Sequence, residues 1–316
     1  MGDMTARYPQ AILVACPSPW NEAYELDTEI FRAEVRGVLA AGFTHVYVFG
    51  TGGEGYGVDT PRFRAVVDLF REETQDHRDV HTMVGVIGLS TPQIVERLRY
   101  AHDVGFRAFQ ISLPSWGALA DDEVLRFFED VCGTFPDSKF LHYNLPRVKR
   151  VLTGLDYARI LPLVPNLVAT KTTGGGMAGA EDLMRHSPEL MHFMGEGNFP
   201  HGSMFGACGL LASFGELAPV MTKRLFDAGV RRDAGELMEL QHAFQRLNTE
   251  LWEQVSNSPH MDGAYDKMLV KLGMLPEFPL RLLSPYQGFT DADYRTFKAF
   301  LEDRYRDWLA PGVLAS

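Results

Sequence analysis

The run NLVATK (166–171) ends in a lysine, an unusual residue at the end of an apolar segment. If the run is a buried strand, alternation places Leu167, Ala169 and Lys171 on one face, with the amine in the interior. An ammonium group is costly to bury, and desolvation lowers its pKa until the free amine can attack a carbonyl carbon. This position therefore indicates either a Schiff-base nucleophile or a lysine that extends to solvent from the strand end.

A tyrosine occupies the corresponding place in a second run, KFLHYN (139–144). Alternation puts Leu141 and Tyr143 on the interior face, while His142 faces the surrounding helices and is expected to be a core histidine. A phenol at the end of an interior strand either packs structurally or moves protons for a reaction. We therefore treat Tyr143 as a candidate catalytic residue.

A glycine-rich segment, GTGGEGYG (50–57), follows another apolar run. Gly50, Gly52 and Gly55 satisfy the G-x-G-x-x-G pattern of dinucleotide sites, but that fingerprint requires a helix to open within the glycines. Here the next helix is predicted to begin only at Thr60, as the N-cap residue, so a nicotinamide site is disfavoured. The remaining interpretations are a turn without a ligand and a cradle for an anion.

As a cradle, this segment would bind an anion through its backbone. The N–H groups of Thr51, Gly52 and Gly53, together with the Thr51 hydroxyl, can hold a carboxylate without a positive charge. A carboxylate site of this kind is compatible with the acidic composition of the chain.

Other polar side chains follow neighbouring runs. Glu196, Asn198 and Ser213 can bind substrate hydroxyls or cap helices. A basic cluster after Tyr143 is either a solvated turn or a substrate clamp; it consists of Arg147, Lys149 and Arg150.

The candidates are spread along a regular alternation of strand-like and helix-like segments. The strand-like runs are 11–16, 45–50, 81–87, 106–113, 139–144, 166–171, 190–195 and 209–215. Amphipathic segments such as 28–42, 60–73 and 90–105 lie between them, and this order predicts parallel βαβ units. Eight units within about 250 residues are typical of a (β/α)8 TIM barrel, in which functional groups gather where the strands end. A doubly wound sheet is the main alternative.

The rest of the chain has no strand-like run. Long amphipathic helices are predicted at 234–255 and 291–309, with a shorter one at 263–274. We therefore predict a catalytic barrel over 1–230 and a C-terminal helical extension over 231–316.

Taken together, the segments AILVACPSP, GTGGE, YNLP, TKTTGG, GEGN and GLLASF, in this order, resemble the dihydrodipicolinate synthase and N-acetylneuraminate lyase family of class I, Schiff-base aldolases. The resemblance implies that Lys171 forms the imine and that Tyr143 shuttles protons. It implies further that the turn at Thr51 and Gly52 holds the carboxylate of a 2-oxo acid such as pyruvate. The remaining expected substrate contacts are Gly53, Thr173, Gly195, Asn198, Ser213 and Arg147.

The chain also departs from the pattern of this family. Relatives usually carry a second hydroxyl where this chain has Gly52, and the synthase itself has an arginine where this chain has Val148. The synthase also uses a tyrosine donated across a subunit contact, near the place of Trp116. These differences argue against dihydrodipicolinate synthesis itself.

We therefore expect a lyase or aldolase that acts on pyruvate or a related 2-oxo acid, in a reversible aldol cleavage or condensation with an aldehyde. A dehydratase of a 2-oxo-3-deoxy sugar acid, working through the same imine, is the alternative, and a non-catalytic sugar-acid-binding protein is another. No metal or dissociable cofactor is expected. Family resemblance implies a homotetramer arranged as a dimer of dimers.

The composition also indicates which binding partners and which cellular compartment to expect. Forty-one acidic against 30 basic residues give a formal net charge of -11, which disfavours nucleic acid and anionic membranes. Three scattered cysteines and the lack of an apolar leader favour a cytoplasmic protein.

Overall fold

The computed structural model describes residues 6–255 and 260–309, and its centre is a closed barrel of eight parallel strands in sequence order. The strands are β1 (Ile12–Ala15), β2 (His45–Val48), β3 (His81–Val86), β4 (Ala108–Ile111), β5 (Lys139–Asn144), β6 (Leu167–Thr172), β7 (Met191–Gly195) and β8 (Gly209–Ala212). Strand β8 pairs with β1 and closes the ring. The predicted TIM barrel is thereby confirmed, and each strand falls in or within one residue of a predicted run.

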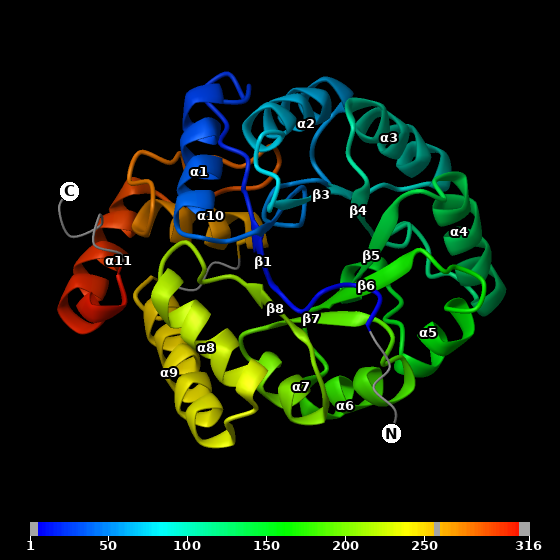
Figure 1. Ribbon diagram of the computed structural model, residues 1–316. Helices are drawn as coiled ribbons and strands as arrows, with labels where there is room; N and C mark the ends of the chain where they lie inside the picture. Colours follow the sequence, from blue (N-terminus) through cyan, green and yellow to red (C-terminus); the bar gives the residue numbers. More distant parts are fainter. Residues whose placement is uncertain (1–5, 256–259, 310–316) are drawn as a thin grey trace.

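Helices follow the strands and form the outer ring (Figure 1). They are α1 (Thr28–Ala40), α2 (Thr60–Thr74), α3 (Thr91–Val104), α4 (Asp121–Thr134), α5 (Gly154–Ile160), α6 (Gly176–His186), α7 (Phe199–Phe205) and α8 (Pro219–Arg231), with a short 3-10 helix η1 (Pro146–Val148) between β5 and α5. The prediction of Thr60 as an N-cap residue is wrong by one position. The Asp59 side chain accepts a hydrogen bond from the Arg62 N–H and caps α2, because a carboxylate is a strong acceptor at this position.

Two hydrophobic layers hold the ring together. Side chains between the strands and the outer helices form the larger core. A smaller cluster fills the barrel itself and includes Tyr47, Leu141, Ala169 and Phe193. Tyr8 belongs to this inner cluster and packs edge-on against His45 and Phe193, so the N-terminal segment covers one end of the barrel.

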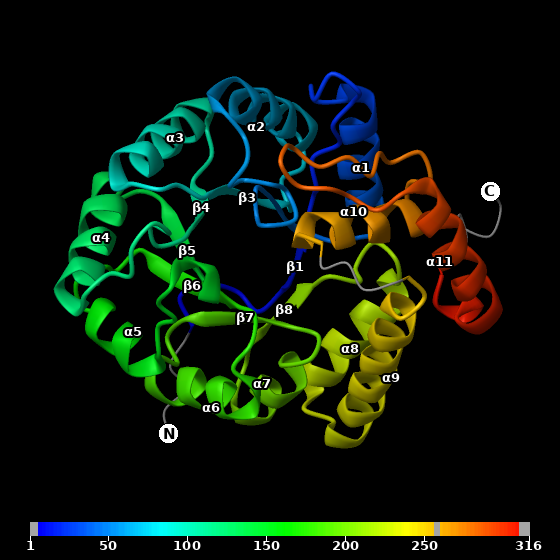
Figure 2. The same ribbon diagram turned by 180° about the vertical axis from the view of Figure 1, so that it is seen from behind.

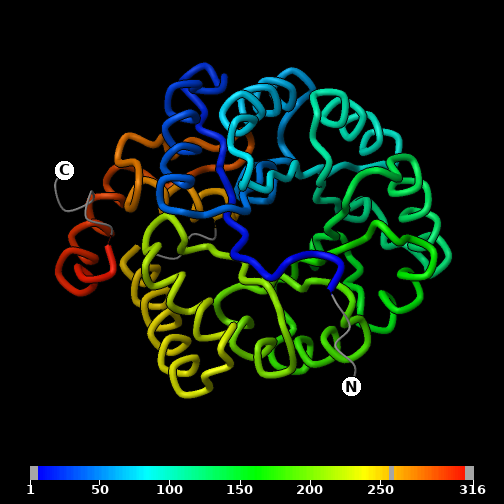
Figure 3. Tube along the Cα trace, viewed as in Figure 1, coloured from blue at the N-terminus to red at the C-terminus, as the bar shows by residue number. Residues whose placement is uncertain are grey.

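Three further helices follow α8, namely α9 (Ala234–Trp252), α10 (Asp262–Leu272) and α11 (Asp291–Arg304), and a 3-10 helix η2 (Arg306–Trp308) comes after them. They lie beside α1 and α8 on one side of the ring (Figures 2 and 3). Leu269 of α10 lines a cavity together with Ala15 of β1 and Ala212 of β8. The predicted boundary between residues 230 and 231 falls one residue before the end of α8, and the division into two units stays a prediction. Within the described residues, no helix is both long and apolar enough to span a membrane.

Candidate active site

Lys171 projects from β6 into the end of the barrel where the strands finish. The side chain is only 4% exposed, and its amine Nζ lies 4.1 Å from the centre of the Tyr143 ring and 4.6 Å from that of Tyr47. The amine donates a 2.7 Å hydrogen bond to the Tyr47 hydroxyl. Burial lowers the pKa of Lys171 to about 7, while the carboxylates of Asp266 and Asp262 act in the opposite direction. A large fraction of the amine is therefore uncharged near neutral pH.

Tyr143 stands next to Lys171 because the two residues are register partners on β5 and β6. The hydroxyls of Tyr143 and Thr51 are 3.1 Å apart, which joins the end of β5 to the glycine-rich turn after β2. Burial raises the pKa of Tyr143, so its phenol stays protonated at neutral pH. As predicted, the neighbouring His142 points outward, where its Nδ1 is 2.7 Å from the Tyr157 hydroxyl.

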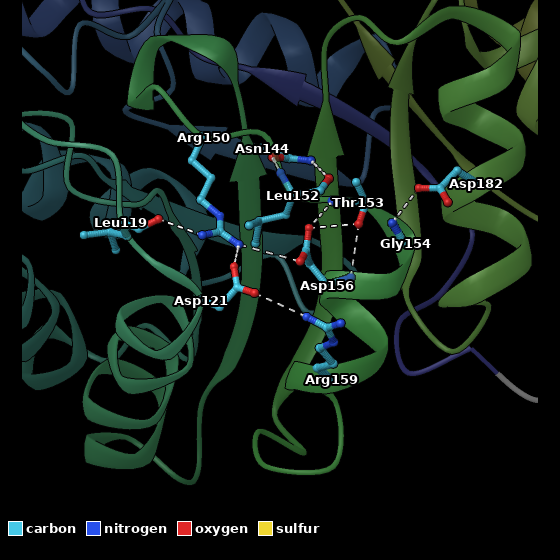
Figure 4. Close-up of polar contacts among 10 residues, drawn as sticks. All are labelled: Leu119, Asp121, Asn144, Arg150, Leu152, Thr153, Gly154, Asp156, Arg159 and Asp182. Carbon is cyan, nitrogen blue, oxygen red and sulfur yellow. Dashed lines mark hydrogen bonds and ion pairs between the residues drawn. The ribbon is translucent and has the colours of Figure 1, made fainter.

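The loop that follows β5 is held by polar contacts, which begin at Asn144, the residue after Tyr143 (Figure 4). The side chain of Asn144 donates to the carbonyl of Leu152 and accepts from its N–H, at 2.7 and 2.8 Å. Arg150 binds the carboxylate of Asp121 at 2.5 Å and approaches Asp156 at 3.7 Å. Arg150 thus anchors this loop.

The glycine-rich segment is a tight turn that comes close to Lys171. Phe49 and Glu54 adopt left-handed backbone conformations, with φ values of 62° and 56°. A side chain at Gly50 would lie 2.7 Å from the Tyr47 ring and 3.2 Å from the Lys171 amine, so only glycine leaves room for both. Of the predicted anion cradle, Thr51–Gly53, the residues Thr51 and Gly52 line the same cavity as Tyr143 and Lys171.

A buried ion pair fixes the turn to α10. The carboxylate of Glu54 accepts hydrogen bonds from Lys267 of α10, from the Trp20 indole and from the Leu283 N–H. Both charged side chains are fully buried. Lys267 also donates to the carbonyl of Arg281, so the C-terminal helices and the turn form one connected network.

Helix α10 brings two further carboxylates to the same cavity. Asp262 forms a bidentate ion pair with Arg147, with both contacts at 2.8 Å. One turn along the helix, Asp266 lies against Gly52: a β-carbon built on that glycine would be 1.7 Å from the carboxylate oxygen Oδ2. Desolvation, reinforced by Asp262, raises the pKa of Asp266 to about 7, and the charge of Lys171 opposes the shift.

These groups line a cavity of about 270 Å³. Among the residues predicted from sequence, its walls include Lys171, Tyr143, Thr51, Gly52, Thr173 and Ser213. An adjoining cavity of about 420 Å³ shares Thr173 and Ser213 and adds Gly195 and Asn198. Asn198 there binds the carbonyl of Gly174, and Glu196 accepts hydrogen bonds from the N–H groups of Ser213 and Phe214. Of the other two predicted contacts, Arg147 is bound to Asp262, and Gly53 accepts from the Ser18 hydroxyl through its carbonyl.

Sequence reasoning missed a second set of cavity residues. The set comprises Tyr47, Asn248, Trp252, Asp262, Tyr265 and Asp266. Tyr47 had a usable signal, since alternation along HVYV (45–48) places it on the interior face. The other residues lie on α9 and α10, and only the tertiary packing of these two helices brings them to the barrel.

The comparisons with known proteins identify a family for this chain. The model of the dihydrodipicolinate synthetase family matches residues 8–284. N-acetylneuraminate lyase 2 of Escherichia coli O6:H1 is 23% identical over 239 residues, which cover 75% of this chain and 78% of the relative. N-acetylneuraminate lyase of Citrobacter koseri is 25% identical over 205 residues, 65% of this chain and 68% of the relative.

Solved structures show the same fold. A prophage protein of the dihydrodipicolinic acid synthase family from Escherichia coli K12, in complex with pyruvate, has a TM-score of 0.81 at 16% identity and covers 93% of this chain and 98% of its own. Dihydrodipicolinate synthase from Aquifex aeolicus also has a TM-score of 0.81, at 18% identity, with coverage of 95% and 99%. The chain belongs to the dihydrodipicolinate synthetase family, and this membership supports aldolase-type lyase chemistry at the level of the family.

Proposed function

We propose that the protein is a Schiff-base lyase or aldolase that acts on pyruvate or a related 2-oxo acid. One observation carries the proposal: an almost fully buried lysine stands between two tyrosine rings, at the base of a cavity, with its pKa lowered to about 7. A buried lysine with no chemical role is costly, whereas a free amine is what imine formation requires. Family membership supports the same reading.

The proposed reaction begins when the neutral amine of Lys171 attacks the keto carbon of the substrate. A C–N bond forms, the carbonyl oxygen leaves as water, and the protonated imine then accepts the electron pair of the C–C bond one carbon further on, between the carbon next to the imine and the carbon that carries the hydroxyl. Cleavage of that bond gives an enamine and an aldehyde, and the proton of the substrate hydroxyl must be removed. The neutral phenol of Tyr143 relays this proton to the enamine carbon by accepting it while donating its own, with Thr51 as its hydrogen-bonding neighbour. Water then hydrolyses the imine, which releases pyruvate and the free amine of Lys171.

The adjoining cavity supports a substrate with a polar tail. Its walls carry the amide groups of Asn198, Gln241, Gln245 and Asn248, which both donate and accept hydrogen bonds. Such groups suit the hydroxyls of a sugar acid, including the N-acetylneuraminate named for the curated relatives. The same fit supports the alternative function, dehydration of a 2-oxo-3-deoxy sugar acid, because the imine also labilises a neighbouring C–O bond.

Product analysis distinguishes these reactions. The protein is incubated with N-acetylneuraminate and with shorter 2-oxo-3-deoxy sugar acids, and the products are separated by mass. Release of pyruvate together with an aldehyde is expected for the lyase, and loss of water alone identifies a dehydratase. Borohydride is expected to abolish turnover only when substrate is present. If substrate binds but neither product forms, the proposed catalysis is contradicted and the protein is a sugar-acid-binding protein.

A further inference from the structure

Asp266 lies against Gly52 of the glycine-rich turn, at the position where relatives in the family usually carry a hydroxyl. A β-carbon on Gly52 would lie 1.7 Å from Oδ2 of Asp266 and 2.7 Å from its carboxyl carbon. A serine or threonine at position 52 is therefore incompatible with Asp266 in its present position. The carboxyl group from α10 and the glycine in the turn are structural counterparts, and the carboxyl group fills the space of the missing side chain.

The position of Asp266 is set by its surroundings. The next residue, Lys267, is fully buried in its ion pair with Glu54, which belongs to the same turn as Gly52. Gly263, one turn earlier, also packs closely on the carbonyl of Gly52. Because the helix is fixed to the turn on both sides of Asp266, its carboxyl group is held at the cavity wall.

The charges around Asp266 are mostly negative. Lys171 on β6 is the cation that faces Asp266 in the cavity. Asp262 lies on α10 like Asp266, and its carboxylate is paired with Arg147. Carboxyl groups also face it from the ends of two strands, Glu196 after β7 and Glu216 after β8. The phenols of Tyr47 and Tyr143 complete the set.

A substrate carboxylate bound at Thr51–Gly53 would thus meet Asp266 at close range. Two carboxylates that share a site cannot both remain ionised at small energetic cost, so one of them takes up a proton. Simple 2-oxo acids are stronger acids than the Asp266 side chain, so Asp266 is the group that takes up the proton.

We propose that Asp266 binds substrate in its protonated form, donating a hydrogen bond to the carboxylate of the 2-oxo acid in place of the missing turn hydroxyl. The inference rests on the function proposed above and adds a residue that determines which head group the site accepts. Since the pKa of Asp266 is raised to about 7, the protonated form is abundant at neutral pH in the free protein. Above that pH binding must take up a proton, and it weakens as pH rises.

The test uses borohydride trapping of pyruvate on the full chain, followed by intact mass, between pH 6 and 9. The concentration of pyruvate that gives half-maximal trapping is compared between the wild type and Asp266→Asn. An amide donates the same hydrogen bond but does not titrate. The ratio of the half-maximal pyruvate concentration of the wild type to that of Asp266→Asn is therefore expected to rise about tenfold per pH unit above pH 7. Asp303→Asn removes an equal charge from an exposed position on α11 and is expected to follow the wild type.

A second variant removes the proposed hydrogen-bond donor altogether. Asp266→Ala removes the donor, and at pH 6 its half-saturating concentration is expected to be about 10-fold or more above the wild-type value, as for a lost hydrogen bond to a charged group. The proposal is overturned if Asp266→Asn shows the pH profile of the wild type, or if Asp266→Ala binds as the wild type does at pH 6. Failure of the proposed function looks different, because then the wild type gives no adduct with any 2-oxo acid at any pH.

Discussion

At the scale of single residues, the central feature is the environment that keeps the Lys171 amine partly uncharged. Burial beside two aromatic rings lowers its pKa, whereas the nearby carboxylates and the Tyr47 hydroxyl stabilise the ammonium form. Lys171 and Tyr143 could be predicted from the sequence because strand alternation alone aims both side chains inward. Asp266 could not, because its role depends on how α10 packs against a turn far away in the chain.

The pH dependence of imine formation follows from the pKa of Lys171. The reactive amine is the deprotonated form, so at saturating pyruvate the trapping rate is expected to rise about tenfold per pH unit below pH 7 and to level off above it. Rapid-quench trapping with borohydride measures this rate. A rate that keeps rising about tenfold per pH unit up to pH 9 would contradict the lowered pKa.

Replacement of Tyr47 by phenylalanine tests its hydrogen bond to Lys171. The ring is retained, but the amine loses an acceptor that favours its charged form, so the midpoint of the pH–rate profile is expected to fall by roughly one unit. The matched control is Tyr157→Phe, which removes a buried hydroxyl bonded to His142 on the outer side of the barrel. That variant is expected to lose stability and keep the wild-type midpoint, and an equal shift in both would rule out a specific effect of Tyr47.

At the scale of secondary-structure elements, the turn after β2 and α10 act as one unit. The sequence predicted both segments, but it did not predict the Glu54–Lys267 pair that joins them, because the register between a turn and a distant helix leaves no local pattern. The exact cap of α2 was also missed, since Asp59 and Thr60 are both good N-cap residues and the choice depends on backbone geometry.

Breaking this pair on one side is expected to be strongly destabilising. Lys267→Met leaves the Glu54 carboxylate buried without its cation and is expected to lower the free energy of unfolding by about 3–5 kcal/mol. The double variant Glu54→Gln/Lys267→Met removes both charges and is expected to recover a large part of the loss. Urea unfolding measures both values.

An exposed pair provides the control for this comparison. Glu181→Gln breaks the surface pair with Arg185 and is expected to change the stability by less than about 1 kcal/mol. If Lys267→Met is no more harmful than Glu181→Gln, the Glu54–Lys267 pair does not anchor α10.

At the scale of the whole molecule, the C-terminal helices complete the barrel protein. Helix α9 packs on α8 and buries Leu240, Phe244 and Leu247, while α10 supplies one wall of the cavity. The barrel could be predicted because eight βα units repeat visibly in the sequence. The contribution of the helices to the cavity could not, because amphipathic periodicity shows that a helix has a buried face and not what that face covers.

A chain that ends at residue 230 is therefore expected not to fold stably on its own. The truncation removes α9, which covers apolar side chains of α8, and it removes Lys267, the partner of Glu54. Each large apolar side chain contributes about 1.5–3 kcal/mol when buried, so the summed loss exceeds the free energy of unfolding of a barrel of ordinary stability. Soluble expression and circular dichroism, compared with full-length Lys171→Met, check this expectation. A truncated chain with a cooperative unfolding transition would contradict it and support two independent units.

The assembly of the protein is a separate prediction at this scale. We propose a homotetramer built as a dimer of dimers, in which Trp116 is a contact residue, because its side chain is 82% exposed in the single chain. Light scattering is expected to give the mass of four chains, and Trp116→Ala to shift the distribution toward smaller species. A monomer at micromolar concentration would contradict the proposal.

The most direct test of Lys171 as the nucleophile is to locate the covalent adduct. The protein is treated with pyruvate and borohydride and digested, and the modified peptide is sequenced by mass spectrometry, with Lys171→Met as the control. We predict one reduced pyruvate on Lys171 in the wild type and none in the variant. An adduct on another lysine, or an equal amount of adduct in Lys171→Met, would show that Lys171 is not the nucleophile.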